Sequence, residues 1–417
     1  MQRLKSEDIR CEKRTAVDPQ TLVAAAEIVE AVRVGGETAV RDFAERFGEV
    51  SVGEELVIEP PEFDSALDRL PTADRELLER TAERIEVFAS AQRRSLSEVT
   101  VEIDGGRAGH HISPVGRAGC YAPGGRYPLP SSVLMTAVTA RVAGVDSVVV
   151  ASPRPTMVTL AAAAVASADA VLAVGGAHAV AALAFGIQGF PSCDVVIGPG
   201  NKWVTAAKQL VSNSVGIDML AGPSELVVLA DETADPLTVA ADLLAQAEHD
   251  PEALPVLVTT SKDLAEAVEA EVDRQLVDLP TRKVAEAALE NGSVVLVPDM
   301  GAAISVCDRL APEHLQVMTR EPERVAERLD HWGGLFIGGH SAEVLGDYGS
   351  GPNHTLPTGG VARYRGGLSV FDFLRVRTWL EIDDPCAARQ LTEDAVALAR
   401  LEGLEAHARA AERRLVD

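Results

Sequence analysis

Residues 146–153, DSVVVASP, form a short run of β-branched residues that ends in serine and proline. The runs DAVLAVGG (169–176) and CDVVIGPG (193–200) repeat this composition. Alanine-rich segments with helical spacing separate or follow the three runs; they are TLAAAAVASA (159–168), AHAVAALAFG (177–186) and NKWVTAAKQLV (201–211). Strands that alternate with helices are typical of β-α-β units around a parallel sheet. This stretch therefore predicts an α/β fold.

A second series of the same kind follows. Its expected strands are ELVVLAD (225–231), ALPVLVTT (253–260), SVVLVPD (293–299) and GGLFIGG (333–339), with helical spacing between them. Two Rossmann-like, doubly wound α/β domains are the simplest architecture, because a chain of 417 residues exceeds the usual size of a single core. The two series are similar either through an internal repeat or through shared α/β composition, and both explanations remain open.

Helices are expected near both ends of the chain. Residues 21–36 and 73–94 place apolar residues three and four positions apart, and the first of these segments ends on a glycine pair. From residue 381 onward the sequence predicts a helical tail with few large apolar residues. Such a tail cannot build a core of its own, so we expect it to dock on another surface.

Composition limits the partners and the compartment. A formal net charge of −25 would repel nucleic acid and anionic lipid, so neither is expected as a partner. Charged residues stand where a signal peptide needs an apolar region, and no stretch reaches the ~18 apolar residues of a membrane span, which predicts a cytoplasmic location. The scattered cysteines indicate buried thiols and neither disulfides nor a thiolate metal site; they are Cys11, Cys120, Cys193, Cys307 and Cys386.

Candidate metal ligands lie in QAEHD, at the end of a helix expected over 235–249. Gln246 and His249 are three residues apart, so both side chains can reach one point. An amide oxygen and an imidazole can bind a cation such as Zn²⁺, but a carboxylate and a second imidazole would be needed to complete the site. The alternative is a polar helix terminus whose histidine interacts with the helix dipole.

Residues 346–360, GDYGSGPNHTLPTGG, have neither helical nor strand periodicity. Asp347 and His354 stand in the kind of loop where α/β folds place functional side chains, so they are candidates for the missing ligands. Turn chemistry explains any one of the polar residues here, although it explains all of them together less readily.

Two further histidines stand close to glutamates. Glu313 and His314, in APEHLQV, are expected where a helix ends and a strand begins, and they offer two proton acceptors of different basicity. His407 follows Glu402 by five residues in LEGLEAHARA. The alternatives are an ordinary helix terminus for the first pair and a solvated helix face for the second.

Two glycine-containing loops precede expected helices, where backbone N–H groups can meet phosphate. They are YAPGGRYPLPSS at 121–132 and VIGPGN at 196–201. Neither matches G-x-G-x-x-G, so the pattern alone gives weak support for a dinucleotide.

Taken in order, these motifs resemble the histidinol dehydrogenase family. The matching segments extend over nearly the whole chain: YAPGG, PLPSSVLMTAV, GPGN, AGPSE, QAEHD, APEHL, GDYGSGPNHTLPT, ARYRGGLSV and EGLEAHA. The resemblance implies a zinc- and NAD-dependent enzyme that oxidises L-histidinol to L-histidine through an aldehyde, in the final steps of histidine biosynthesis. It also implies a homodimer with shared active sites.

The resemblance further implies a role for each matching residue. Gln246, His249 and Asp347 would bind zinc together with His407 of the partner subunit. His314 would take the alcohol proton, and Glu313 would activate the water that attacks the aldehyde. The substrate would contact the zinc ligands and also Ser131, Ser224, His354 and Glu402. NAD would contact Tyr121, His178 and Asn201.

The resemblance also implies four parts of the chain. Residues 1–24 would be a helical N-terminal segment, and 25–120 together with 225–368 would form the α/β domain that carries the zinc and catalytic residues. Residues 121–224 would form the NAD-binding domain, and 369–417 would be a swapped C-terminal dimerisation tail.

Some features depart from the family pattern. His178 stands where the biosynthetic enzymes usually carry glutamine. GRAGCYAPGG and RTWLEI also resemble a sister branch that oxidises a sulfonated propanediol, but that branch has a lysine after the metal-binding aspartate, where this chain has Tyr348. PLPSSVLM favours the histidinol branch. A sulfopropanediol dehydrogenase and a non-catalytic binding homologue remain the alternatives.

Overall fold

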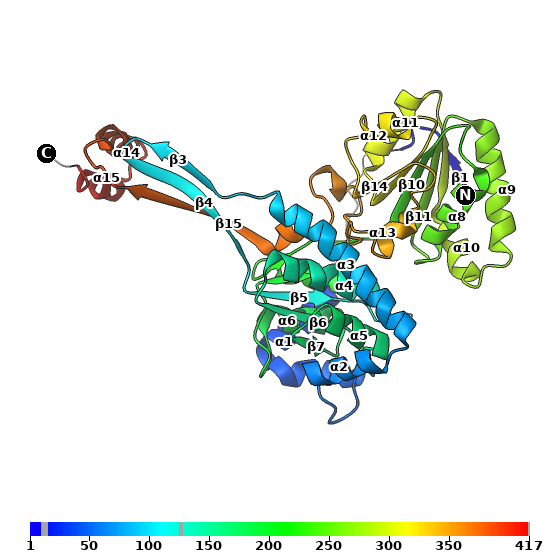
Figure 1. The fold of residues 1–417 in the computed structure, drawn as a ribbon, viewed down its shortest axis with the longest axis horizontal. Helices are drawn as coiled ribbons and strands as arrows, with labels where there is room; N and C mark the ends of the chain where they lie inside the picture. The colour runs from blue at the N-terminus through cyan, green and yellow to red at the C-terminus, as the bar shows by residue number, and fades with distance from the viewer. Residues whose placement is uncertain (10–15, 125–127, 416–417) are drawn as a thin grey trace.

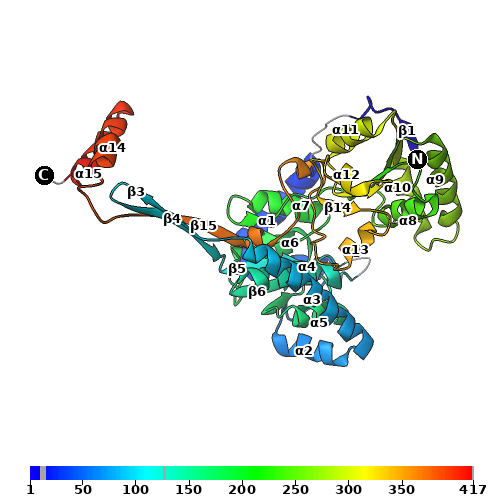
Figure 2. The same cartoon turned by 45° about the horizontal axis from the view of Figure 1, so that its top comes forward.

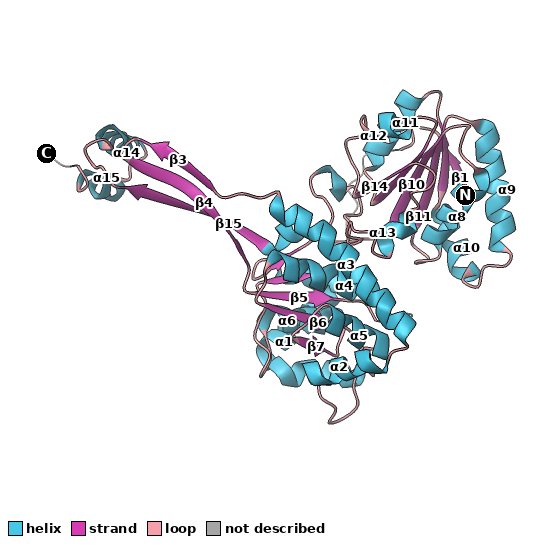
Figure 3. Ribbon diagram, in the orientation of Figure 1, coloured by secondary structure: helices cyan, strands magenta, loops and turns pink. Residues whose placement is uncertain are grey.

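The computed structural model describes residues 1–9, 16–124 and 128–415. Two six-stranded sheets, each flanked by helices, form the body, and a three-stranded sheet extends from the body as an arm (Figure 1, Figure 3). The predicted α/β fold with parallel sheets is confirmed. Each described helix is too short or too polar to cross a membrane.

Sheet A is entirely parallel, in the order β1-β12-β11-β10-β13-β14. Its strands are β1 (Gln2–Leu4), β10 (Glu225–Ala230), β11 (Leu254–Thr259), β12 (Ser293–Leu296), β13 (His314–Met318) and β14 (Gly334–Ile337). Alternate residues of β10 point to opposite faces, so Leu226 and Val227 belong to different core clusters. One face packs on α8 (Pro236–Ala247), α9 (Lys262–Leu276) and α10 (Arg282–Asn291), and the other on α11 (Met300–Leu310) and α12 (Pro322–Ala326).

The N-terminal segment differs from its prediction. Gln2–Leu4 form β1, which pairs with β12 at the edge of sheet A, and the helix α1 begins only at Pro19, after the N-cap Asp18. For residues 2–4 the predicted helix was wrong, because the edge of sheet A offers backbone hydrogen bonds to an extended chain. Residues 10–15 of the predicted segment 1–24 lie outside the described residues, and 19–24 are helical.

Sheet B has the order β2-β7-β6-β5-β8-β9, with β2 antiparallel to β7 and the other pairs parallel. Its strands are β2 (Val57–Ile58), β5 (Arg117–Tyr121), β6 (Ser147–Ala151), β7 (Ala170–Leu172), β8 (Val195–Ile197) and β9 (Gly216–Ile217). One face packs on α1 (Pro19–Arg46), α6 (Gly176–Phe185) and α7 (Lys202–Val211). The other packs on α2 (Pro60–Arg69), α3 (Thr72–Arg94), α4 (Pro130–Ala143) and α5 (Met157–Val165).

The membership of sheet B corrects the predicted assignment of residues 25–120. These residues were placed with 225–368, but α1, β2, α2, α3 and β5 all belong to sheet B and its helical layers. Their apolar faces, for example Val32 and Ile85, find their partners in the cores on the two sides of this sheet. The predicted boundary at residue 120 falls inside β5.

The helix α1 extends further than its glycine pair predicts. It bends at Gly36, where φ is 55° and ψ is −135°, and then continues to Arg46. Glycine adopts this backbone conformation without the strain that a side chain would add. The helix resumes because Val40 and Ala44 are fully buried against sheet B.

The arm is an antiparallel sheet of β3 (Val99–Ile103), β4 (Gly106–Pro114) and β15 (Leu374–Ile382), and it ends in α14 (Arg389–Leu401) and α15 (Glu405–Glu412). Figure 2 shows that both helices lie far from the two large sheets. The helical tail begins later in the chain than the predicted residue 381, since β15 continues to Ile382 and α14 begins at Arg389.

The irregular stretch predicted at 346–360 connects the two large sheets. Its first two residues complete the short helix α13 (Glu343–Asp347), and the rest is irregular up to the 3₁₀ turns at Val361–Arg363 and Val370–Phe373. Arg84 Nε on α3 donates to Gly349 O at 2.7 Å, and Asn353 Nδ2 donates to Met135 O on α4 at 2.7 Å. The stretch therefore joins α13, beside sheet A, to two helices of sheet B.

Three of the cysteines fit the prediction of inert buried thiols. Cys120, Cys193 and Cys307 are buried, and burial raises the pKa of Cys120 to about 12. Cys386 is exposed, contrary to the prediction, because it lies in the turn before α14 on the arm. Cys11 lies outside the described residues.

Candidate active site

A cluster of polar side chains lies at the amino-terminal edge of sheet A. His314 opens β13, where it pairs with Leu226 near the start of β10 and with Gly334 at the start of β14. The helix α8 crosses from β10 to the parallel strand β11, so its last turn, with Gln246, returns to the same edge. Functional sites of open parallel sheets usually lie at the opposite, carboxyl edge.

Glu313 and His314 are buried and held in place by one backbone segment. Glu313 Oε2 accepts a hydrogen bond from Glu225 N at 2.8 Å, and His314 Nδ1 lies 3.1 Å from Glu225 O. A carbonyl oxygen can only accept, so this contact assigns a proton to Nδ1. His314 Nε2 is buried without a hydrogen-bond partner in the described chain, 3.8 Å from Asp347 Oδ1. Nε2 is therefore the ring nitrogen available for proton transfer.

The charges of the cluster shift its proton affinities. Burial raises the pKa of Glu313 to about 7. Burial alone would lower the pKa of His314, but the carboxylates of Glu313, Asp347 and Glu343 outweigh it and raise that pKa to about 10. Burial also works against the charged form of Asp347, yet contact with His314 lowers the pKa of this carboxyl. Ionisation of the three carboxyl groups would give the cluster a negative potential, so a bound cation would favour their charged forms.

The predicted metal ligands on this chain converge in part. His249 Nε2 lies 3.7 Å from Asp347 Oδ2. Two donors that bind one small cation with bonds near 2 Å lie about 3–3.5 Å apart, so the observed distance is close to that of a ligand pair. Gln246 is fully buried, and both of its amide atoms lack a partner in the described chain. A buried amide without a partner is costly unless a ligand completes its bonding. These amide, imidazole and carboxylate donors fit a zinc ion.

Glu343 was not among the predicted residues. It opens α13, is 1% exposed, and both carboxylate oxygens lack a hydrogen-bond partner in the described chain. Its Oε1 lies 3.9 Å from His314 Nε2, and burial raises its pKa to about 8. The donor atoms of His314, Glu343 and Asp347 lie within 4.8 Å of one another, so this group offers a second possible cation site that shares Asp347. The four-residue spacing in EVLGD was the available sequence signal.

His354 connects the cluster to the helix α4. Its Nδ1 lies 3.0 Å from Asp347 O, and its Nε2 lies 3.2 Å from Ser132 Oγ. The carbonyl contact assigns the proton to Nδ1, so Nε2 accepts from the serine hydroxyl, and burial lowers the pKa of His354. The predicted contact residue was Ser131, which is half-buried in the first turn of α4, whereas the hydrogen bond comes from its neighbour.

The remaining predicted substrate residues lie in two places. Ser224 is half-buried and immediately precedes β10, at the same sheet edge as His314. Glu402 and His407 are exposed at the end of α14 and in α15, at the tip of the arm and far from α8 and α13 (Figure 1). The structure therefore does not bring these two residues to the cluster of their own chain.

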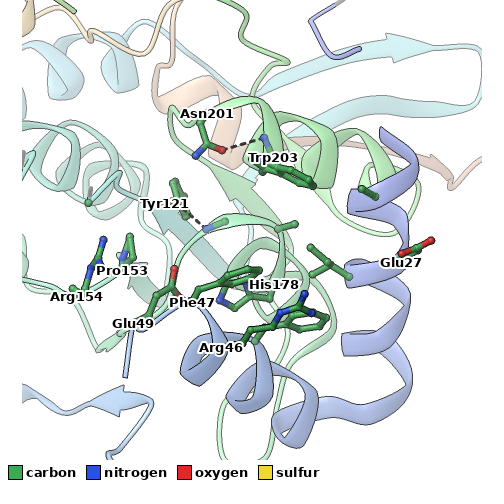
Figure 4. A pocket seen from close by; sticks show the side chains of 16 residues that line it. Glu27, Arg46, Phe47, Glu49, Tyr121, Pro153, Arg154, His178, Asn201 and Trp203 are labelled. Carbon is green, nitrogen blue, oxygen red and sulfur yellow. Dashed lines mark hydrogen bonds and ion pairs between the residues drawn. The ribbon is translucent and has the colours of Figure 1, made fainter. Parts of the chain in front are cut away.

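The predicted NAD contacts line a cavity of about 670 Å³ beside sheet B. Figure 4 shows Tyr121, His178 and Asn201 around it. Tyr121 ends β5 and its Oη accepts from Gly176 N at 3.1 Å. Asn201 is the N-cap of α7, where its Oδ1 accepts from Trp203 N at 3.0 Å.

The cavity occupies the topological switch point of sheet B. Strands β6 and β7 follow β5 on one side, whereas the chain then crosses to β8 on the other side of β5. Tyr121 is the last residue of β5, and Asn201 follows the carboxyl end of β8, where open parallel sheets usually bind ligands. A volume of this size lies within the range of small-molecule and cofactor sites.

An acid–histidine cluster on one parallel sheet and a cofactor-sized cavity on another define a parallel α/β enzyme with a polar reaction site. The chain belongs to the histidinol dehydrogenase family, whose sequence profile matches residues 12–415. The predicted family is thereby confirmed.

Individual relatives agree over nearly the full length. The histidinol dehydrogenase of Parasynechococcus marenigrum is 45% identical over 396 residues, which cover 93% of this chain and 90% of that protein. The protein of the same name from Pseudomonas savastanoi is 42% identical and covers 94% of this chain and 88% of its own. The crystal structure of histidinol dehydrogenase from Elizabethkingia anophelis superposes with a TM-score of 0.92 at 29% identity, over 100% of this chain and 98% of that one.

Proposed function

We propose that this protein is an NAD-dependent oxidoreductase that converts L-histidinol to L-histidine through L-histidinaldehyde, in histidine biosynthesis. Family membership supports the substrate and the reaction. The observation that carries the chemistry is the buried His314, whose Nδ1 is held by a backbone carbonyl while its Nε2 is left for proton transfer. A general base held in this way is what the oxidation of an alcohol requires.

The first oxidation removes a proton and a hydride from the carbinol. His314 Nε2 takes the proton of the carbinol hydroxyl, and NAD⁺ held in the cavity of sheet B would supply the hydride acceptor for this oxidation and for the second one. Glu313, oriented by Glu225 N, then removes a proton from water as its oxygen attacks the aldehyde carbon. Because each oxidation would consume one NAD⁺, two NADH would form for each L-histidine.

Gln246, His249 and Asp347 of this chain would hold the zinc ion, with His407 of the partner subunit completing the set. A bound zinc ion supplies positive charge that anchors the substrate's nitrogen atoms and opposes protonation of nearby imidazoles. The amide of Gln246, which has no partner among the described residues, and the approach of His249 to Asp347 support this ligand set. Ser131, Ser224 and His354 of this chain would surround the substrate, together with Glu402 of the partner subunit.

The cavity of sheet B would hold NAD, with Tyr121, His178 and Asn201 along its wall. The helix α4 begins after the loop that follows Tyr121, and Ser132 in its first turn reaches His354 at the polar cluster. An extended dinucleotide that reached from the cavity toward His314 would pass along this side of α4.

The molecule would act as a homodimer in the cytoplasm. The arm carries exposed apolar side chains that a second subunit would cover, among them Val376 at 61%, Leu380 at 64% and Leu401 at 83% exposure. A partner that received α14 and α15 would gain Glu402 and His407, which lie far from the cluster of their own chain (Figure 1).

NADH formation tests the proposal directly. Absorbance at the NADH band should rise with L-histidinol and NAD⁺, stop after chelation, and return with Zn²⁺. Two NADH for each L-histidinol consumed are expected. No NADH with L-histidinol would contradict the proposal; in that case, NADH with a dihydroxypropane sulfonate would indicate the sister branch, and no turnover of either substrate would indicate a binding homologue.

A further inference from the structure

We propose that Glu49 is a positioning residue of the cavity beside sheet B: it fixes His178 so that ring atom Nδ1 accepts a hydrogen bond from the nucleoside part of the dinucleotide. This inference rests on the proposed use of this cavity for NAD. It adds a residue outside the three predicted contacts and gives His178, the departure from the family pattern, a role of its own.

Glu49 and His178 form a buried pair from distant parts of the chain. Glu49 follows the end of α1, and His178 lies in the first turn of α6. His178 Nε2 lies 2.8 Å from Glu49 Oε2, and the same oxygen accepts from Gly175 N at 3.0 Å. The side chain of His178 is 2% exposed and that of Glu49 is 11% exposed, so solvent screens this contact little.

The contact determines which ring nitrogen remains free. Because the carboxylate accepts, His178 Nε2 carries a proton. The other ring nitrogen, Nδ1, takes no part in this contact, and His178 lines the cavity. In the tautomer with the proton on Nε2, Nδ1 can accept a hydrogen bond from a ribose hydroxyl or an amino group. A glutamine carries its own acceptor, so it would need no carboxylate to select a tautomer.

Aromatic side chains hold the same ring and shape the cavity. The rings of Phe43 and Phe47 lie 5.9 and 5.6 Å from the ring of His178. Phe47 is 49% exposed and lines the cavity with Trp203 (Figure 4). Exposed aromatic faces of this kind are suited to the planar base of a nucleoside.

The backbone at the start of α6 is partly occupied. Glu49 accepts from Gly175 N, and Tyr121 Oη accepts from Gly176 N. These are two of the N–H groups that could otherwise receive a phosphate at this helix start. Their occupation favours the nucleoside part, rather than the pyrophosphate, as the group beside His178.

Binding of NADH, followed by quenching of tryptophan fluorescence, tests the role of Glu49 without turnover. Glu49→Gln should weaken NADH binding about tenfold, since it removes a charged acceptor shared by two donors. Glu30→Gln is the matched control, because it removes a carboxylate from an exposed pair with Arg33 on α1 and should leave binding unchanged. Thermal unfolding establishes that each variant is folded at the assay temperature.

A second background separates positioning from general support of the fold. In His178→Gln protein, Glu49→Gln should change NADH affinity less than about twofold, because the side chain that Glu49 orients is gone. An equal loss in both backgrounds, or no loss in the wild-type background, would overturn the inference. Failure of the wild-type protein to bind NADH would instead overturn the proposed NAD function.

Discussion

His314 shows how burial and backbone contacts prepare a single side chain for chemistry. Its Nδ1 is held by Glu225 O, so the ring cannot turn without losing that hydrogen bond, and Nε2 stays directed toward Asp347 and Glu343. Glu313, its neighbour in the chain, is fixed by Glu225 N. One peptide segment thereby orients both proposed proton acceptors.

Replacing His314 tests its role as a base. His314→Asn should reduce turnover by about 10²–10⁴-fold, the usual contribution of a general base, while zinc content stays that of the wild type. Initial rates and metal analysis of the same preparation measure both quantities. Unchanged turnover would remove His314 from the mechanism.

Two substitutions distinguish the two cation sites that share Asp347. His249→Asn should lower zinc content at least tenfold at limiting metal, roughly the effect of losing one ligand bond. Glu343→Gln, which keeps the shape of the side chain, should retain zinc and lower turnover, since Glu343 lies beside His314 Nε2. Zinc that is lost with Glu343→Gln and kept with His249→Asn would place the ion among His314, Glu343 and Asp347.

At this scale, the sequence predicted the residues that stand in distinctive motifs and missed those defined by packing. The spacing in QAEHD and the polar loop around Asp347 indicated ligands, and the structure brings His249 and Asp347 within 3.7 Å. Glu343 and Ser132 escaped notice, because their importance depends on contacts with His314 and His354 on other elements.

Among the elements, the loop between β8 and α7 depends on a buried ion pair. Lys208 on α7 pairs with Asp218, and Lys208 Nζ donates to Gly198 O at 3.0 Å. Asp218 Oδ2 accepts from Gly198 N at 2.7 Å. The two side chains therefore hold both sides of a glycine whose φ of 116° few other residues tolerate. This loop leads directly to Asn201.

Breaking this pair should destabilise the protein more than removing it. Lys208→Met should lower the free energy of unfolding by about 3–5 kcal/mol, because it leaves a buried carboxylate without its cation. The double variant Lys208→Met with Asp218→Asn should regain part of that loss. Denaturant unfolding measures both; a Lys208→Met protein as stable as the wild type would show that the pair contributes nothing.

The elements that sequence patterns predicted best are the buried parallel strands. DSVVVASP and its counterparts are uniformly apolar because both faces of each sheet are covered. The strand β15 was missed although Val376, Thr378 and Leu380 alternate with polar or aromatic residues, the pattern of a strand with two different faces. The assignment of 25–120 failed for another reason, since the choice between two similar sheets depends on long-range packing.

The whole molecule places its two proposed functions on different sheets. The cavity proposed for NAD lies at the carboxyl edge of sheet B, and the acid–histidine cluster lies at the amino edge of sheet A. The stretch 346–360 joins the cluster to α4 of sheet B through His354, which contacts Asp347 O and Ser132 Oγ. The arm, in contrast, extends away from both (Figure 2).

In the proposed homodimer, His407 completes the zinc site of the partner subunit. His249→Asn and His407→Asn should each give inactive homodimers, because each removes a ligand from both sites. Co-expression of the two chains should restore about a quarter of wild-type activity, since half of the dimers are mixed and each mixed dimer has one intact site. If both ligands of a site came from one chain, mixing would restore no activity, and that result would contradict the shared site.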